Sequence, residues 1–447
     1  MLQDSKYHSS EINITRWLGL ALLGNAFAQK LSEIISVSSF FSNVGVNQII
    51  WVWVIDGTLM LAVTSLQSLI IDRYSRRKIM EYMVIFIAMS FIFLQVIMTL
   101  NAPAWLSQSL LFLLSQQQWL TFPLIFWVFT NDLLGINQAK RLIPKIASWG
   151  FAGYALGISF IGFTSWLMQR LNLPHTWMIT LCLIINIAIY GGIFSLLRGP
   201  LSHYKIRSVA QVSESIHEIL IEGWDFVREV ELFRYLVMAV LATVSCETII
   251  DFRFFKASFA AFPDLYSYQM VQSIYLFFRA IIEGMISQFI AQPLIHRTGL
   301  RAVFFLQPMA SLAATIFMVT IPSFVGSLAG IFSQKSAQYG IDEPARKALQ
   351  ALVPQERRGR VSNFIDGYMI GLGGILGALI IAMFTVVGSL AEIDLIDSNF
   401  YLIGALVAAM VALISTWKMY QTYNTSMLDW RLHRRKRGDS VLDNLDF

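Results

Sequence analysis

Charged residues and cysteines are scarce in this chain of 447 residues. Only 14% of the residues are charged, whereas 56% are hydrophobic. This balance excludes a disordered chain and an ordinary soluble domain. The two cysteines, Cys182 and Cys246, lie in apolar segments, so no disulfide framework is expected. The composition therefore indicates a polytopic membrane protein.

Sequence motifs of common enzyme and metal chemistry are also missing. The chain has no Gly-x4-Gly-Lys-Ser/Thr loop, no paired-histidine zinc helix and no Gly-x-Ser-x-Gly nucleophile turn. The six histidines are scattered without ligand spacing. We therefore expect neither enzymatic activity nor a cofactor or metal site. The formal charge of +5 does not point to nucleic acid, because the basic residues lie mostly in short loops and the C-terminal tail, where membrane topology accounts for them.

Long apolar runs predict an all-α integral membrane protein with twelve transmembrane helices. A helix needs about 20 apolar residues to cross a bilayer. The first apolar run follows a short polar segment and lacks a small-residue cleavage site, so we expect that helix to remain in the mature protein. The predicted spans are 16–41, 47–71, 80–101, 105–131, 146–168, 174–197, 231–256, 267–294, 301–321, 324–342, 362–387 and 398–420.

The loops between these spans differ in charge. On one side of the predicted membrane there is little basic charge beyond Arg170 and Lys256. By the positive-inside rule, the basic side is cytoplasmic, which places both termini in the cytoplasm and the chain in the cell (inner) membrane. The basic side contains Arg73, Arg76, Arg77, Lys78, Lys140, Arg141, Lys145, Lys205, Arg207, Arg297, Arg301, Arg346, Lys347, Arg357, Arg358, Arg360 and the tail from Arg431.

The polar segment 201–230 divides the chain into two six-helix halves, 1–200 and 231–424, followed by a basic tail at 425–447. Within the segment, capping-box spacing between Ser215 and Glu218 and an apolar stripe predict an interfacial amphipathic helix at 211–230. The alternative is that the segment only connects the halves. The tail has the composition that binds anionic lipid or a protein partner, although membrane topology explains its charge equally well.

The two halves have related sequence motifs at equivalent positions. The loop after the second span reads Ser68-Leu-Ile-Ile-Asp72-Arg73-Tyr-Ser75-Arg76-Arg77, and the loop after the eighth has related spacing at Arg297, Gly299 and Arg301. Glycines recur in the fifth and eleventh spans, where close helix packing is the favoured explanation. Parallel six-helix repeats are one architecture of secondary transporters, with the solute site between the halves.

The first of these loops resembles the signature of the major facilitator superfamily between its second and third helices, with Ser68 and Ser75 replacing two glycines. In that superfamily the cluster latches the cytoplasmic gate. The resemblance therefore implies a gating role for Asp72, Arg73 and Arg76. Lys140 and Arg141, in the loop after the fourth span, are assigned to the same gate.

Three further stretches, 126–144, 342–347 and 358–367, resemble the ATP/ADP translocase-like nucleotide carriers and their bacterial relatives. The resemblance implies site roles for Asp132 in the fourth helix and Glu247 in the seventh. Two cationic positions of the exchangers are Ser32 and Leu372 here. A triphosphate needs several fixed cations, because each buried anionic oxygen must be paired. We therefore do not expect ATP/ADP exchange itself.

Ionisable side chains fall well inside the predicted hydrocarbon region. Such groups are costly there and mark solute pathways by default. Lys30 with Glu33, and Arg279 with Glu283, could instead form ion pairs that close on themselves. Helices one, four, seven and ten line the cavity of the superfamily, which makes Arg279 and Asp56 second choices. The full set is Lys30, Glu33, Asp56, Glu247, Arg279, Glu283 and Lys335.

These observations predict a secondary transporter that works by alternating access and moves an anionic or zwitterionic organic metabolite. Lys30 and Lys335 are expected to hold the anionic part, while Glu33 and Glu247 respond to a proton or a positive group. The expected partners are a small-molecule solute and the lipid bilayer. One alternative is a nucleotide exchanger in which Arg279 and Lys335 replace the missing cations. The other is a non-transporting membrane subunit or scaffold that retains the carrier fold.

Overall fold

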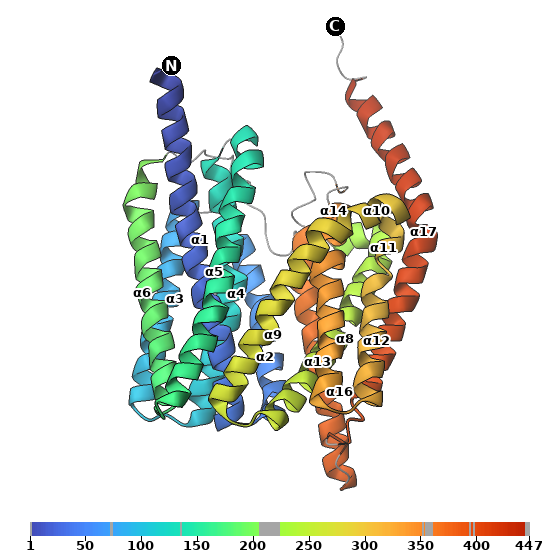
Figure 1. Ribbon diagram of the computed structural model, residues 1–447. Helices are drawn as coiled ribbons and strands as arrows, with labels where there is room; N and C mark the ends of the chain where they lie inside the picture. Colours follow the sequence, from blue (N-terminus) through green and yellow to red (C-terminus); the bar gives the residue numbers. More distant parts are fainter. Residues whose placement is uncertain are drawn as a thin grey trace. The chain divides into compact units, whose positions relative to one another are not determined.

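The computed structural model describes residues 2–71, 75–134, 136–204, 224–350, 353, 361–392, 395–396 and 398–442. Side chains from residue 424 onward lie outside the described part. Every regular element of the described residues is helical (Figure 1). Asp72, Arg73, most of the predicted linker helix and the side chains of the basic tail lie outside the described part. The all-α fold is confirmed.

Nine helices of the described residues are long and apolar enough to cross a membrane. Three other long helical segments are interrupted by polar side chains within their apolar stretch: α1 (Leu2–Asn43) by Lys30, α4 (Ala104–Leu133) by Gln117, and the continuous segment 324–350 by Lys335. Twelve membrane-crossing segments are therefore consistent with the structure. The protein is an all-α integral membrane protein.

The helices divide into two compact units. Unit 1 contains Met1–Val52, Ser65–Glu214 and Ser258–Ala280, and unit 2 contains Trp53–Thr64, Ser215–Ala257 and Ile281–Phe447. The middle of α2 (Ile49–Ile71) thus packs with the C-terminal helices, and the first part of α9 (Leu265–Met285) packs with the N-terminal ones. The remaining helices are α3 (Arg76–Thr99), α5 (Ile136–Arg170), α6 (Thr176–Arg198), α8 (Glu231–Ala261), α10 (Gln292–Thr298), α11 (Leu300–Val303), α12 (Leu306–Thr320), α13 (Phe324–Ala337), α14 (Glu343–Gln350), α16 (Ile370–Ala391) and α17 (Leu402–Leu442).

Glycines let α5 approach α1 within unit 1. A Cβ atom at Gly153 would lie 2.2 Å from the carbonyl oxygen of Leu23, and one at Gly157 would lie 2.9 Å from that of Phe27. Only a residue without a side chain fits such a crossing, which is typical of small residues between membrane helices. The packing role predicted for the glycines of the fifth span is confirmed at these positions.

Three π-helical turns, at Ile286–Ala291, Gln338–Asp342 and Phe364–Met369, interrupt the helices of unit 2. Pro293 and Pro344 follow the first two turns. Proline lacks an N–H group and crowds the carbonyl four residues before it, which favours a wider turn there. A Cβ atom at Gly340 would lie 2.6 Å from Ile286, so these two turns also pack on each other.

Candidate functional site: two buried charge clusters

The first cluster lies in unit 2 and consists of Lys335, Glu247, Asp251 and Gln338, called here the Lys335 cluster. Glu247 and Asp251 are one turn apart on α8 and therefore share a face. The Nζ atom of Lys335, on α13, lies 2.5 Å from Oε1 of Glu247 and 2.9 Å from Oδ2 of Asp251. The Lys335 side chain is only 8% exposed. One lysine thus faces two carboxylates, and these three charges leave an excess of one negative charge.

Gln338 completes the coordination of Glu247. Its Nε2 atom donates to Oε2 of Glu247 at 2.8 Å, and its own Oε1 accepts from Gln334 at 3.2 Å. Both oxygens of Glu247 therefore have a donor, which a buried carboxylate needs in order to remain charged. The sequence analysis did not select Gln338. Its position one turn after Lys335 on a polar helix face was the available signal.

The second cluster lies in unit 1 and consists of Lys30, Glu33, Gln29 and Tyr154, called here the Lys30 cluster. Lys30 and Glu33 form an ion pair, as the self-closing alternative predicted, and Gln29 donates to the same carboxylate at 2.9 Å. The Nζ atom of Lys30 lies 4.4 Å from the ring centroid of Tyr154 on α5. Lys30 is 7% exposed but Glu33 is 28% exposed, so the carboxylate is the more accessible partner.

Arg279, on the part of α9 that belongs to unit 1, repeats this contact with an aromatic ring. It donates to the hydroxyl of Tyr275 at 3.2 Å, and its guanidinium lies 5.4 Å from the ring centroid. It is also near enough to Lys30 for the two positive charges to interact. Asp56 and Glu283 are half-buried residues of unit 2.

Beside the Lys30 cluster, uncharged polar groups connect α1, α4 and α6. Ser32 and Gln118 both donate to Oδ1 of Asn186 at 3.2 Å. Ser32 is fully buried. Ser32, which the resemblance aligned with a cationic position of the exchangers, therefore faces a neutral network. Asn186 and Gln118 were not predicted as site residues, although amides inside apolar segments were a readable signal.

Two residues predicted to act separately, Arg76 and Asp132, lie together in unit 1. Nη1 of Arg76 is 2.5 Å from Oδ1 of Asp132, whose side chain is 7% exposed. Burial raises the pKa of the Asp132 carboxyl, and the Arg76 guanidinium acts in the opposite direction. Asp132, which the resemblance assigned to the solute, thus contacts a residue assigned to the gate.

The other predicted gate residues have different surroundings. Arg141 is exposed and pairs at 2.5 Å with Glu11 of α1. The side chain of Lys140 lies outside the described part. Arg77, which was not selected, donates to the carbonyl oxygens of Leu201, Ser202 and Tyr204 at 2.7–3.1 Å. It anchors the chain after α6 to the start of α3.

A third set of charges lies near the ends of α14 and α16 in unit 2. Asp366 accepts from Lys347 at 2.6 Å and from Gln350 at 3.1 Å, and it lies 3.3 Å from Nε of Arg346. Arg346, Lys347 and Asp366 belong to the stretches that resemble the nucleotide carriers. Among the described residues, no group of three or more His, Cys, Asp or Glu side chains could hold a metal ion.

Comparisons with known proteins identify the fold. No protein-family model and no curated protein sequence matches the chain. Solved transporter structures do match. A mutant of nucleoside transporter NupG has a TM-score of 0.62 at 11% identity, covering 92% of this chain and 99% of that chain. An auto-inhibited POT family peptide transporter has a TM-score of 0.63 at 10% identity, covering 91% and 96%. An inward-facing bacterial homologue of the iron transporter ferroportin has a TM-score of 0.60 at 14% identity, covering 92% and 98%.

At these identities the likeness shows the fold alone. The chain shares the fold of these transporters. The finer resemblance to ATP/ADP translocase-like carriers stays a prediction.

Proposed function

We propose that the protein is a secondary transporter that works by alternating access and moves an anionic or zwitterionic organic metabolite. The observation that carries this proposal is that each unit buries an ion cluster around a lysine, Lys30 in α1 and Lys335 in α13. Ionisable groups at this depth in a membrane protein are costly and ordinarily serve a solute or an ion. The transporters with the same fold support the same class of function.

The clusters suit a solute that competes for the lysines. Lys30 pairs with Glu33, and Lys335 pairs with Glu247 and Asp251. An anionic group of the solute would take over a lysine, and the released carboxylate would then bind a proton or a positive group of the same solute. Such an exchange of partners keeps every buried charge compensated.

A nucleotide-like solute is one candidate, because of the resemblance to ATP/ADP translocase-like carriers. A triphosphate is disfavoured, since Ser32 is fully buried in a neutral network and the other cationic position is Leu372. We therefore favour a monophosphorylated or carboxylated metabolite. In this proposal Asp72, Arg73, Arg76, Lys140 and Arg141 latch the gate on the cytoplasmic side, and both termini lie in the cytoplasm of a cell with the protein in its inner membrane.

The experiment has two stages. Purified protein is screened by thermal shift against nucleotides, phosphorylated metabolites, carboxylates and amino acids, because a ligand of the native state raises its apparent stability. Uptake of the radiolabelled hits, and of ATP, is then measured in proteoliposomes. Lys30→Ala and Lys335→Ala should each reduce uptake at least tenfold, while Lys145→Ala, an exposed lysine of α5, should not. Unchanged uptake in both variants would remove the site. Absence of any uptake would favour the non-transporting membrane subunit.

A further inference from the structure

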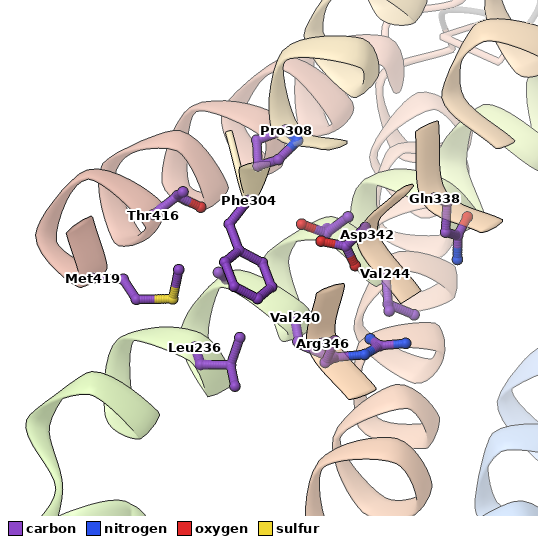
Figure 2. Close-up of a pocket in the computed structure, with 12 residues that line it drawn as sticks. Leu236, Val240, Val244, Phe304, Pro308, Gln338, Asp342, Arg346, Thr416 and Met419 are labelled. Atoms are coloured by element: carbon purple, nitrogen blue, oxygen red, sulfur yellow. The ribbon is translucent and has the colours of Figure 1, made fainter. Parts of the chain in front are cut away.

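A small cavity lies in unit 2, lined by residues of α8, α12, α17 and the helix 324–350 (Figure 2). Its volume of about 30 Å³ is enough for roughly two water molecules. One part of its wall is apolar and comes from Leu236, Val240, Val244, Phe304 and Met419. The other part is polar and comes from Thr243, Gln338, Asp342, Arg346 and Thr416. The cavity therefore combines polar groups that water can bind with a wall that separates them from lipid.

Asp342 is the carboxylate of this cavity, and Figure 2 shows it between Phe304 and Gln338. The charged groups that face it are Arg346 and Glu343 on α14, Asp366 in the π-helical turn at 364–369, and Glu247 on α8. The residues that α12 and α17 contribute to the wall carry no charge. Three carboxylates and one guanidinium thus surround Asp342.

The single guanidinium is shared. Nε of Arg346 lies 3.3 Å from Oδ1 of Asp366, so Arg346 serves that carboxylate as well as Asp342. Asp342 is half-buried, and a carboxylate that is partly withdrawn from water with an incomplete share of positive charge is stabilised by taking up a proton. Polar groups that line a cavity of this size are ordinarily satisfied by buried water, which supports hydration of the cavity.

Gln338 connects the cavity to the Lys335 cluster. It lines the cavity and donates to Glu247 at 2.8 Å. Gln338 and Asp342 are the first and last residues of one π-helical turn. Turns of this kind occur often at functional sites, since they can revert to the α-helical register. A change of charge at Asp342 can therefore shift the donor that holds Glu247.

We infer that Asp342 is a proton-binding site, reached through water in this cavity and coupled by Gln338 to the ion pair of Glu247 and Lys335. The carboxylate takes its proton from a hydronium ion and leaves a water molecule in the cavity. The neutral acid releases its share of Arg346 to Asp366. The role of this proton in transport rests on the proposed function, whereas the binding of the proton does not.

The test is infrared difference spectroscopy of the full chain reconstituted in lipid, titrated from alkaline to acidic pH. The C=O stretch of a protonated carboxylic acid is separate from the amide bands and moves in D₂O. We expect a component of this band that appears at a higher pH than the protonation of exposed carboxyls. It should be lost completely in Asp342→Asn and kept in the matched control Asp225→Asn, which removes an exposed carboxyl that does not line the cavity. Asp342→Glu should keep a shifted component, which protects the test if the Asn variant does not fold.

A component that remains in folded Asp342→Asn, or that Asp225→Asn removes equally, would overturn the inference. Loss of the component at constant pH when sodium chloride replaces choline chloride would show that Asp342 binds sodium. That result would also overturn the inference. The measurement needs no solute. A component that behaves as expected in a protein that moves no solute would therefore refute the proposed function and leave the proton site standing. Uptake of a solute by a protein that lacks this component would refute the proton site and leave the proposed function standing.

Discussion

The ammonium group of Lys335 lies between two carboxylates of α8 and is 2.5 Å from Glu247, the nearer one. Neither residue has much contact with water, since their side chains are 8% and 12% exposed. The pair therefore stabilises the protein only while both charges are present.

Removal of one partner of the Lys335–Glu247 pair should lower the free energy of unfolding more than removal of both. Lys335→Ala removes the cation that Glu247 and Asp251 share and should lower the free energy of unfolding by about 3 kcal/mol. Adding Glu247→Gln should recover part of that loss, because less uncompensated charge remains. Thermal or denaturant unfolding in detergent measures the double-mutant cycle. A double variant as unstable as the sum of the two single variants would show that the residues do not interact.

The crossing of α1 and α5 should not tolerate a methyl group. In Gly153→Ala the new Cβ would lie 2.2 Å from the carbonyl oxygen of Leu23, so the helices must separate. We expect a strong loss of monodisperse protein on gel filtration and a lower unfolding temperature. Gly192→Ala on α6 is the control, because nothing lies within 4 Å of its Cβ position. Equal behaviour of the two variants would contradict the close approach.

Arg77 should hold the segment after α6 in place. Arg77→Ala removes three charge-assisted hydrogen bonds to backbone carbonyls, and a local loss of about 1.5 kcal/mol corresponds to roughly tenfold faster amide exchange. Hydrogen exchange at Ser202 and Tyr204, which donate to nearby backbone carbonyls, measures this. The exposed neighbour Lys78, changed to alanine, should leave the exchange unaltered. Unchanged exchange in Arg77→Ala would show that the segment is held by other contacts.

Loss of Arg76 should make stability depend on pH through Asp132. Burial raises the pKa of this carboxyl and Arg76 opposes that shift, so Arg76→Ala should raise the pKa further. A carboxyl with a raised pKa favours the folded state in its protonated form. Its contribution is therefore gained as pH falls through that pKa and lost as pH rises. We expect Arg76→Ala to be more destabilised at alkaline than at acidic pH. In the double variant with Asp132→Asn this difference should vanish, and its persistence would assign it to another group.

Several features followed from the sequence because they depend on local composition. Apolar runs of membrane-crossing length predicted the all-α fold, and the glycines of the fifth span predicted close packing. The spacing of Lys30 and Glu33 allowed the ion pair that the structure contains, since residues three apart on a helix are neighbours.

Other features arise only where distant segments meet. Nothing local to Lys335 indicates that Glu247 and Asp251 are its partners, and Asp132 and Arg76 are 56 positions apart. The cavity around Asp342 needs side chains from several helices, so no single stretch reveals it. The sequence by itself determined that this is a helical membrane protein with costly charges at depth, because hydrophobicity and helical periodicity are properties of short segments. The tertiary structure decided which charges compensate one another, because electrostatic pairing depends on distance in space and not on separation along the chain.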